Sequence, residues 1–129
     1  MKIEVDTSQL DRIAGKLRDL SPVFQQIGAM ADNKLQQTQS AGADPYGNTW
    51  KPKKTGEASF LRNTGDLEAS RSWTAGGMEA RVGYGAFYAK FHQNGTSKMV
   101  ARPLVPEGDI PPDWQEEIQD IVDRFASSL

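Results

Sequence analysis

The stretch Val82–Val105, VGYGAFYAKFHQNGTSKMVARPLV, decides how the chain folds. It holds four of the eight Phe and Tyr residues, the only His and a Gly-rich turn. Glycines flank Tyr84, where we expect a strand to end, and Asn94-Gly95 marks a turn. After that turn, residues 99–105 are expected to form a strand that stops at the following prolines.

Three aromatic residues occupy the middle of this stretch. Residues 86–93 fit either one helical turn or a loop, with Phe87, Tyr88 and Phe91 as core anchors. Just upstream, residues 72–75 and 78–83 read as two strands joined at Gly76-Gly77, a pair that suits a two-residue hairpin turn. The sequence therefore predicts a small, mainly antiparallel sheet, preceded by a short helix from about Thr64 to Arg71.

Apolar periodicity predicts two helices before this region. Residues 2–6 alternate as in an edge strand, and Thr7 or Ser8 then caps a helix with the stripe Leu10, Ile13, Ala14, Leu17 and Leu20. Ser21-Pro22 restarts the pattern, with Ser21 as the expected N-cap. The second stripe is Phe24, Ile27, Ala31 and Leu35. This helix is expected to end near Gly42, and the short break favours an angled or antiparallel helix pair.

A third amphipathic helix is predicted at the C-terminal end. It opens at Ile110-Pro111-Pro112-Asp113, and its stripe is Trp114, Ile118, Ile121, Val122 and Phe125. We expect this face to pack on the sheet. The predicted fold is α+β, a single domain over residues 1–129 with an N-terminal helix pair, a small sheet and a C-terminal helix.

Between the second helix and the hairpin lies the least regular part of the chain. Asp44-Pro45-Tyr46-Gly47-Asn48 predicts a turn, because Asp bonds its own backbone, Pro fixes φ and Gly supplies a positive φ. Trp50 follows and needs a site in which to bury its ring. Residues 51–58 are expected to form an exposed, mobile basic loop.

This loop is the best candidate for contact with nucleic acid. Lys51, Lys53 and Lys54 offer positive charge, and Trp50 beside them is a possible ring for base stacking. Three lysines neutralise few phosphates, however, so a solvated loop is the simpler explanation, with a contact to another subunit as an alternative. A ring of several copies around a DNA-filled channel would multiply the charge.

Charge is distributed unevenly along the 129 residues, whose net charge is −2. Residues 34–64 carry five basic and two acidic side chains, whereas residues 106–129 carry one Arg and seven acidic side chains. Such asymmetry suits head-to-tail contact between identical subunits, or else it reflects two solvated faces. The apolar content is lean, which favours a domain that gains stability from partner subunits.

Several chemistries lack the residues they need. The chain has no Cys, which excludes disulfides and thiolate metal sites, and no apolar run predicts a membrane span. Gly83-x-Gly85 lacks the third Gly of a dinucleotide fingerprint. His92 has no partner at ligand or nucleophile spacing. We therefore expect no enzyme activity, no cofactor and no metal, and a protein made in the cytoplasm.

The motifs, taken in order, resemble the phage virion morphogenesis family, the tail-completion proteins of Mu-like and P2-like phages. The resemblance covers most of the chain, and its core is Tyr-Ala-x-x-His-Gln-x-Gly. The matching residues are Asp44, Pro45, Gly47, Trp50, Leu61, Thr64, Gly65, Leu67, Ser70, Val82, Gly83, Tyr88, Ala89, His92, Gln93, Gly95, Arg102, Pro103 and Leu104.

The resemblance implies a structural protein at the head-proximal end of a phage tail. It implies a homo-oligomeric ring, six copies by family analogy, that completes the tail or joins it to the head. The implied partners are tail-tube or head-tail connector proteins, with DNA in the channel as a further contact, and the implied location is the virion. The rival hypothesis is a nucleic-acid-binding module that uses Trp50 and the three lysines.

Overall fold

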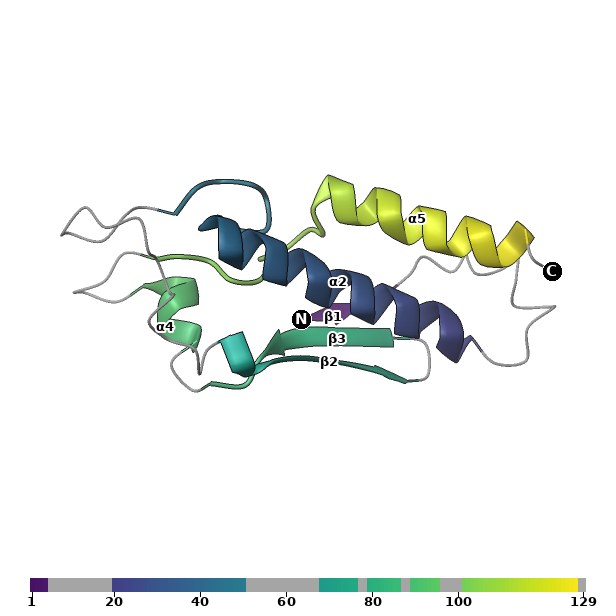
Figure 1. Ribbon diagram of the computed structural model, residues 1–129, viewed down its shortest axis with the longest axis horizontal. Helices are drawn as coiled ribbons and strands as arrows, with labels where there is room; N and C mark the ends of the chain where they lie inside the picture. Colours follow the sequence, from purple (N-terminus) through teal and green to yellow (C-terminus); the bar gives the residue numbers. More distant parts are fainter. Residues whose placement is uncertain (5–19, 51–67, 77–78, 87–88, 96–100, 128–129) are drawn as a thin grey trace.

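The computed structural model describes residues 1–4, 20–50, 68–76, 79–86, 89–95 and 101–127. Their elements, in order, are β1 (Lys2–Ile3), α2 (Ser21–Ala41), β2 (Arg71–Gly76), β3 (Glu79–Tyr84), α4 (Ala89–Asn94) and α5 (Pro112–Ser127) (Figure 1). Helices and a small antiparallel sheet confirm the α+β class. The first helix of the predicted N-terminal pair falls largely within residues 5–19, outside the described part of the chain.

The three strands form one antiparallel sheet in the order β1-β3-β2. β1 lies at an edge, as predicted, and its pairing continues where the Val82 N–H donates to the Met1 carbonyl oxygen at 2.9 Å. Gly76 is paired opposite Glu79 and therefore belongs to β2. The predicted turn at Gly76-Gly77 is thus wrong by one residue, because strand pairing includes the first glycine.

Helix α2 buries the predicted stripe Phe24, Ile27, Ala31 and Leu35 completely. Its N-cap is Leu20 and no side chain caps it, so the prediction of Ser21 as N-cap is wrong. The Val23 N–H donates instead to the Leu20 carbonyl oxygen at 3.0 Å. The helix ends at Gly42, whose φ of 70° is left-handed and strains residues that carry a Cβ.

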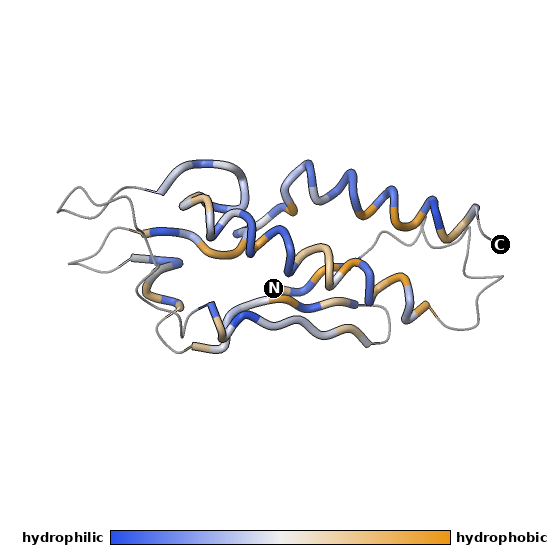
Figure 2. The backbone as a smooth tube through the Cα atoms, in the orientation of Figure 1, coloured by the Kyte–Doolittle hydropathy of each residue, from blue (hydrophilic) through white to orange (hydrophobic). Residues whose placement is uncertain are grey.

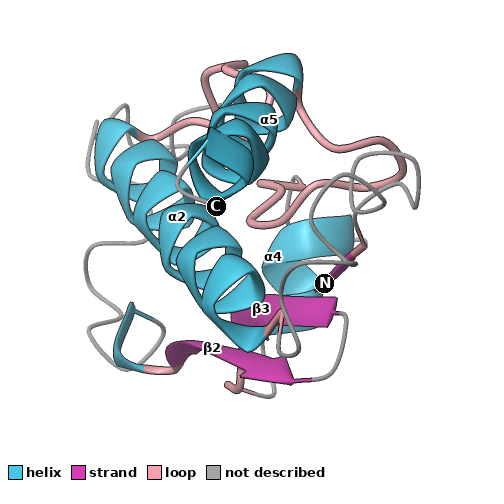
Figure 3. Cartoon of the chain, turned by 90° about the vertical axis from the view of Figure 1, so that its right-hand side faces the viewer, coloured by secondary structure: helices cyan, strands magenta, loops and turns pink. Residues whose placement is uncertain are grey.

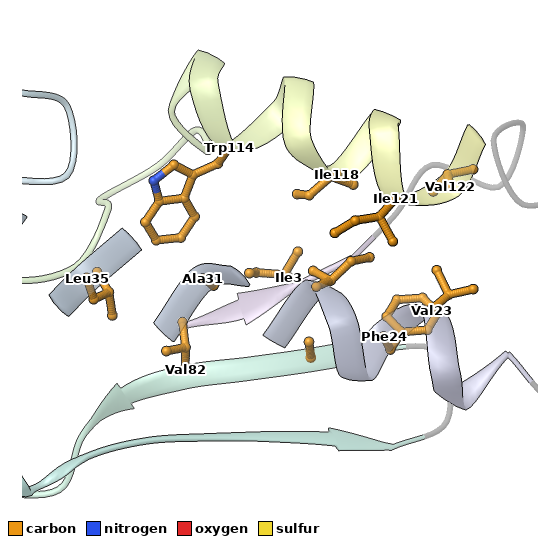
Figure 4. Close-up of a cluster of buried hydrophobic side chains, with 12 residues drawn as sticks. Ile3, Val23, Phe24, Ala31, Leu35, Val82, Trp114, Ile118, Ile121 and Val122 are labelled. Carbon is orange, nitrogen blue, oxygen red and sulfur yellow. The ribbon is translucent and has the colours of Figure 1, made fainter. Parts of the chain in front are cut away.

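Helices α2 and α5 and the sheet enclose what we call the main core (Figure 3). Trp114, Ile118 and Ile121 of α5 point toward the sheet side chains Ile3 and Val82 (Figure 4). All these residues belong to one buried cluster with the stripe of α2. The remaining members are Val23, Ala80 and Val122.

The predicted face of α5 is confirmed. Its stripe is buried apart from Phe125, which is partly buried and packs against the main core. On α5, the hydrophobic positions lie on the side of the helix toward α2, and the hydrophilic positions lie on the opposite side (Figure 2). The α5 face therefore packs against α2 as well as against the sheet side chains.

Helix α2 approaches β2 closely at one residue. A Cβ built on Gly28 would lie 2.5 Å from Cε3 of Trp73, so this contact requires glycine. Trp73 covers Gly28 while remaining 37% exposed at the margin of the sheet. The α2–β2 spacing is thus set by an aromatic ring lying on a glycine.

Two expectations for the Val82–Val105 stretch are wrong. Residues 101–105 contain no strand, although residues 99–105 were expected to form one. Residues 89–94 do form a helical turn, but Phe91 is 41% exposed and belongs to neither buried cluster of the described residues. Ala89 and Gln93, four residues apart, share one face of α4, and Phe91 therefore lies on the opposite face. Its ring instead contacts Lys90, whose Nζ lies 5.2 Å from the ring centroid.

The expected short helix before β2 is described only at its end. Glu68 and Ala69 are helical, and β2 already begins at Arg71. Thr64, Gly65, Leu67, the aromatic pair at 87–88 and the basic loop at 51–58 lie outside the described residues.

Candidate functional site

The turn after α2 has the predicted chemistry. The Asp44 carboxylate accepts hydrogen bonds from the backbone N–H of Tyr46 at 2.9 Å and of Asn48 at 3.0 Å. The Asn48 side chain also donates to it, at 3.1 Å. Gly47 has a φ of 93°, and Pro45 is buried. Asp44 therefore fixes the path of the chain as it leads to Trp50.

Trp50 lies in a second, smaller core. Only 4% of it is exposed, and its indole N–H donates to the Pro103 carbonyl oxygen at 2.9 Å. It clusters with Leu104, and Tyr84, Ala86 and Ala89 pack against the pair. We call this cluster, together with Gln93, the Trp50 corner. The predicted burial of the Trp50 ring is confirmed, and the alternative of stacking on a nucleic-acid base is wrong because the ring is already buried.

Gln93 holds residues 104–105 in the way a neighbouring strand would. Its side-chain oxygen accepts the N–H of Leu104 at 2.7 Å and of Val105 at 3.0 Å. Its side-chain nitrogen donates to the Val105 carbonyl oxygen at 2.9 Å and to Glu107 Oε1 at 2.8 Å. The backbone groups that a strand would pair with a neighbour are thus satisfied by one amide side chain, which explains why the predicted strand is absent here.

The end of α4 supports this arrangement. Gly95 has a φ of 74°, and its N–H donates to the Phe91 carbonyl oxygen at 2.8 Å. Arg102, two residues before Leu104, is buried with 8% exposure. The Gln-x-Gly and Arg-Pro parts of the sequence motif therefore meet in space and serve one local structure.

Tyr84 connects the Trp50 corner to the main core, since it packs against both. Its hydroxyl donates to Gln39 Oε1 at 2.7 Å. Burial raises the pKa of Tyr84 to about 12, which keeps the hydroxyl neutral and able to donate. The Gln39 side-chain nitrogen is buried and has no hydrogen-bond partner among the residues that the structure describes.

The structure unites part of the predicted set. Trp50, Ala89, Gln93 and Pro103 meet at the Trp50 corner. Asp44, Pro45 and Gly47 belong to the turn that leads to Trp50, Gly95 follows the end of α4, and Arg102 directly precedes Pro103. Lys51, Lys53, Lys54, Thr64, Gly65, Leu67 and Tyr88 lie outside the described residues, and the His92 side chain is likewise undescribed.

Some contributors were missed from the sequence. Gln39 continues the buried stripe of α2 four residues after Leu35, and a polar residue at such a position signals a buried partner. Tyr46 was assigned only to the turn, yet its hydroxyl donates to the carbonyl oxygens of Glu107 and Asp109. That contact spans the chain and has no local signal.

Charge within the molecule is partly compensated. Lys34 Nζ of α2 lies 3.0 Å from Glu117 and 3.3 Å from Asp113, both on α5. These carboxylates raise the pKa of Lys34, the pairing with Glu117 contributing most. Lys34, one of the cations in the basic region 34–64, is therefore paired with the acidic helix α5 of the same molecule.

Within the described ranges, no three His, Asp or Glu side chains are placed to hold a metal ion. No described helix has both the length and the apolarity to cross a membrane. The Trp50 corner is thus an arrangement of buried rings and backbone hydrogen bonds, which can position neighbouring segments.

Comparison with known proteins identifies a family. The model of the phage virion morphogenesis family matches residues 4–125, a range that includes every residue of the Trp50 corner. No curated protein and no solved structure matches the chain. Because the family match extends over nearly the whole sequence, the chain belongs to the phage virion morphogenesis family.

Proposed function

We propose that the protein is a structural component of the phage tail that completes its head-proximal end or joins it to the head. The observation that carries this proposal is the family match over residues 4–125. The proposed role consists of binding neighbouring proteins, and it requires no catalysis. Its site of action is the tail or neck of the virion, after assembly in the host cytoplasm.

The protein acts as a homo-oligomeric ring, with six copies by analogy with the family. Uneven charge supports this, because the exposed face of α5 is acidic whereas the segment after Trp50 is basic. In a ring of identical copies each subunit uses two different surfaces, so opposite charges on separate parts of one chain favour closure.

The Trp50 corner fixes the residue from which the basic segment Lys51–Lys54 begins. Trp50 is buried and bonded to Pro103, and Lys51 follows it directly. A segment that starts from such an anchor is presented at a defined place on each subunit. In the assembled particle, it contacts a neighbouring subunit, a tail or connector protein, or DNA in the channel.

Electron microscopy of particles tests this role. Removing the gene from the genome that encodes it is expected to yield DNA-filled heads and separate tails, because the joint is incomplete. Supplying the wild-type protein from a plasmid should restore joined virions. Normal numbers of joined, infectious particles without the protein would overturn the proposal.

A DNA titration of the purified protein separates this role from that of a nucleic-acid-binding module. Weak binding by isolated subunits is expected, since few phosphates can be neutralised by three lysines. Tight binding by the monomer that falls steeply with salt would favour the rival.

A further inference from the structure

The two edges of the sheet differ in how they are protected. β1 and β2 lie on opposite sides of β3 (Figure 1). β1 is two residues long, and Lys2 within it pairs with Glu4 directly after it. β2 is six residues long and contains neither Lys nor Pro. Short length, lysine and proline are common means of preventing a sheet edge from pairing with another chain. The edge at β1 has two of these features, and the edge at β2 has none.

The backbone hydrogen bonds indicate which groups of β2 point away from β3. The Gly85 N–H donates to the Ser70 carbonyl oxygen at 3.0 Å, in the register that pairs β2 with β3. Hydrogen-bonded pairs alternate along an antiparallel ladder, so the even-numbered residues of β2 bond to β3. The backbone N–H and C=O groups of Arg71, Trp73 and Ala75 therefore point outward. Among the described residues, none of these outward groups has a hydrogen-bond partner.

The side chains of β2 also suit a neighbouring strand. Arg71 is the only charged residue of β2, and it turns toward α2, where its Nε lies 3.0 Å from Asp32 Oδ1. Trp73 also faces α2, yet 37% of it is exposed. Ser72 and Thr74 point to the other face of the sheet, where they are exposed and uncharged. A strand beside β2 therefore meets no uncompensated charge, and it can place a side chain next to Trp73.

A second copy of β2 is the occupant that fits this edge. Of the described strands, β3 is paired on both sides and β1 is short and charged, so only β2 offers a strand of matching length. Antiparallel pairing centred on Trp73 places Trp73 opposite Trp73 and Arg71 opposite Ala75. All outward groups are then paired, no like charges meet, and two aromatic rings are neighbours. A shift of two residues in either direction places one outward residue beyond the end of the partner strand.

We propose that β2 pairs antiparallel with β2 of a second copy of this chain and joins the two sheets into one. The contact uses the same strand on both copies, so it is isologous and differs from the heterologous contacts that close a ring. The inference therefore does not rest on the ring proposed above. One strand from each copy is a small contact beside the roughly 1,200 Å² of a stable interface, so the pairing is reversible and depends on protein concentration.

Hydrogen exchange of the full chain over a range of concentrations tests the pairing at single residues. The Trp73 and Ala75 amides should exchange quickly in dilute protein, and about tenfold or more slowly where the dimer predominates. The Thr74 amide is the internal control, because it bonds to β3 within each copy and should be protected throughout. Slow exchange of Trp73 and Ala75 in dilute protein that sediments as a monomer would mean that the chain covers its own edge, and it would overturn the proposal.

Sedimentation velocity measures the dissociation constant for two variants of Ala75. Ala75→Pro removes an outward N–H and is compatible with an edge strand, whereas Ala75→Ser retains the N–H at a similar side-chain volume. Each dimer loses this hydrogen bond twice by symmetry, so Ala75→Pro should raise the constant about tenfold or more. Ala75→Ser should leave it within about twofold. Circular dichroism verifies that both variants are folded. Association of Ala75→Pro that is as tight as that of wild type would place the contact elsewhere and overturn the proposal.

Charge exchange tests the register. Pairing centred on Trp73 places Ser72 opposite Thr74 of the other copy. Ser72→Lys combined with Thr74→Lys, and Ser72→Glu combined with Thr74→Glu, should each lose self-association because like charges meet. Mixing the two double variants should restore association between unlike copies. Gln36→Lys combined with Gln37→Lys is the matched control, since it adds the same charge on exposed positions of α2. Unlike copies that stay apart would overturn the proposed register.

Different outcomes separate this inference from the proposed function. Wild-type protein whose Trp73 and Ala75 amides exchange equally fast at every concentration would overturn the β2 contact, whether or not the protein forms a ring. That result leaves the role in the tail untouched. The role in the tail fails instead if joined, infectious particles form without the protein, and the β2 contact of the purified chain can persist in that case.

Discussion

In the main core, apolar side chains recur at helical and strand spacing and lose nearly all their exposure to water. In the Trp50 corner, side chains make hydrogen bonds to irregular backbone and hold it in place. The buried pair of this corner is Trp50 and Leu104. The first region is stabilised mainly by apolar area, and the second by the placement of a few polar groups. Mutations in the two regions should therefore differ in size and in how far their effects spread.

The largest expected effect is in the main core. Phe24 of α2 is completely buried in the main core, so Phe24→Ala removes a ring and leaves a cavity. We expect a loss of about 3–5 kcal/mol in the free energy of unfolding. Urea denaturation measures it, with the exposed neighbour Gln25→Ala as control. A loss below about 1 kcal/mol would show that the core repacks readily around the site.

The Trp50 corner should respond locally. Gln93→Leu keeps a similar side-chain volume but leaves the backbone groups of Leu104 and Val105 without their partner. The expected loss is about 1–3 kcal/mol. Hydrogen exchange at the Leu104 and Val105 amides should accelerate more than exchange in α2, and Gln37→Leu on the exposed face of α2 is the control. Equal acceleration throughout would mean that the two regions unfold as one.

This contrast also explains which parts of the fold were predictable. The stripes of α2 and α5 follow from spacing alone, because period 3.6 places their apolar residues on one face. The Asp44 turn follows from residue chemistry, since the side chain bonds backbone two and four residues ahead. Local rules were sufficient for both.

The interactions that were missed depend on tertiary context. Residues 99–105 were expected to form a strand, but in residues 101–105 the Gln93 side chain takes the backbone groups of Leu104 and Val105 that a neighbouring strand would pair with. Phe91 was expected inside because it is aromatic, whereas the face of α4 that turns inward carries Ala89 and Gln93. Trp50 was expected to bury its ring, but local rules did not identify its buried neighbour Leu104, which is distant in the sequence. Local rules therefore did not predict the contacts that these residues make in space.

A smaller effect is expected at Tyr84, where the two regions meet. Tyr84→Phe removes the hydroxyl that donates to Gln39 Oε1. Among the described residues, the oxygen and the nitrogen of the Gln39 side-chain amide would then both lack a hydrogen-bond partner. Near neutral pH the expected loss is about 1–2 kcal/mol. The stability difference from wild type should depend on pH, because burial raises the pKa of Tyr84 from 10.0 to about 12.

The sign of that dependence follows from proton binding. Between pH 10 and 12, the unfolded chain loses the Tyr84 proton while the folded chain retains it, so wild-type stability falls as pH rises. Tyr84→Phe lacks this contribution, and the difference between the two proteins should shrink over that range. Urea unfolding of both proteins at pH 8, 10 and 11 measures it. A difference that stays constant would mean that Tyr84 ionises as readily in the folded protein as in the unfolded chain.

The smallest effect tests whether surface charge adds to the main core. Lys34 pairs with Asp113 and Glu117 across the contact between α2 and α5, but both carboxylates are about half exposed, at 57% and 47%. Solvent screens such pairs, and Lys34→Met should therefore cost less than about 1 kcal/mol. The loss should disappear in about 1 M salt, where charges are screened within about 3 Å. Urea unfolding at low and high salt checks this, with Lys90→Met on α4 as the matched control. A larger loss that persists in high salt would mean that the buried methylene groups of Lys34 stabilise the contact between α2 and α5. The apolar packing of the main core would then extend to Lys34.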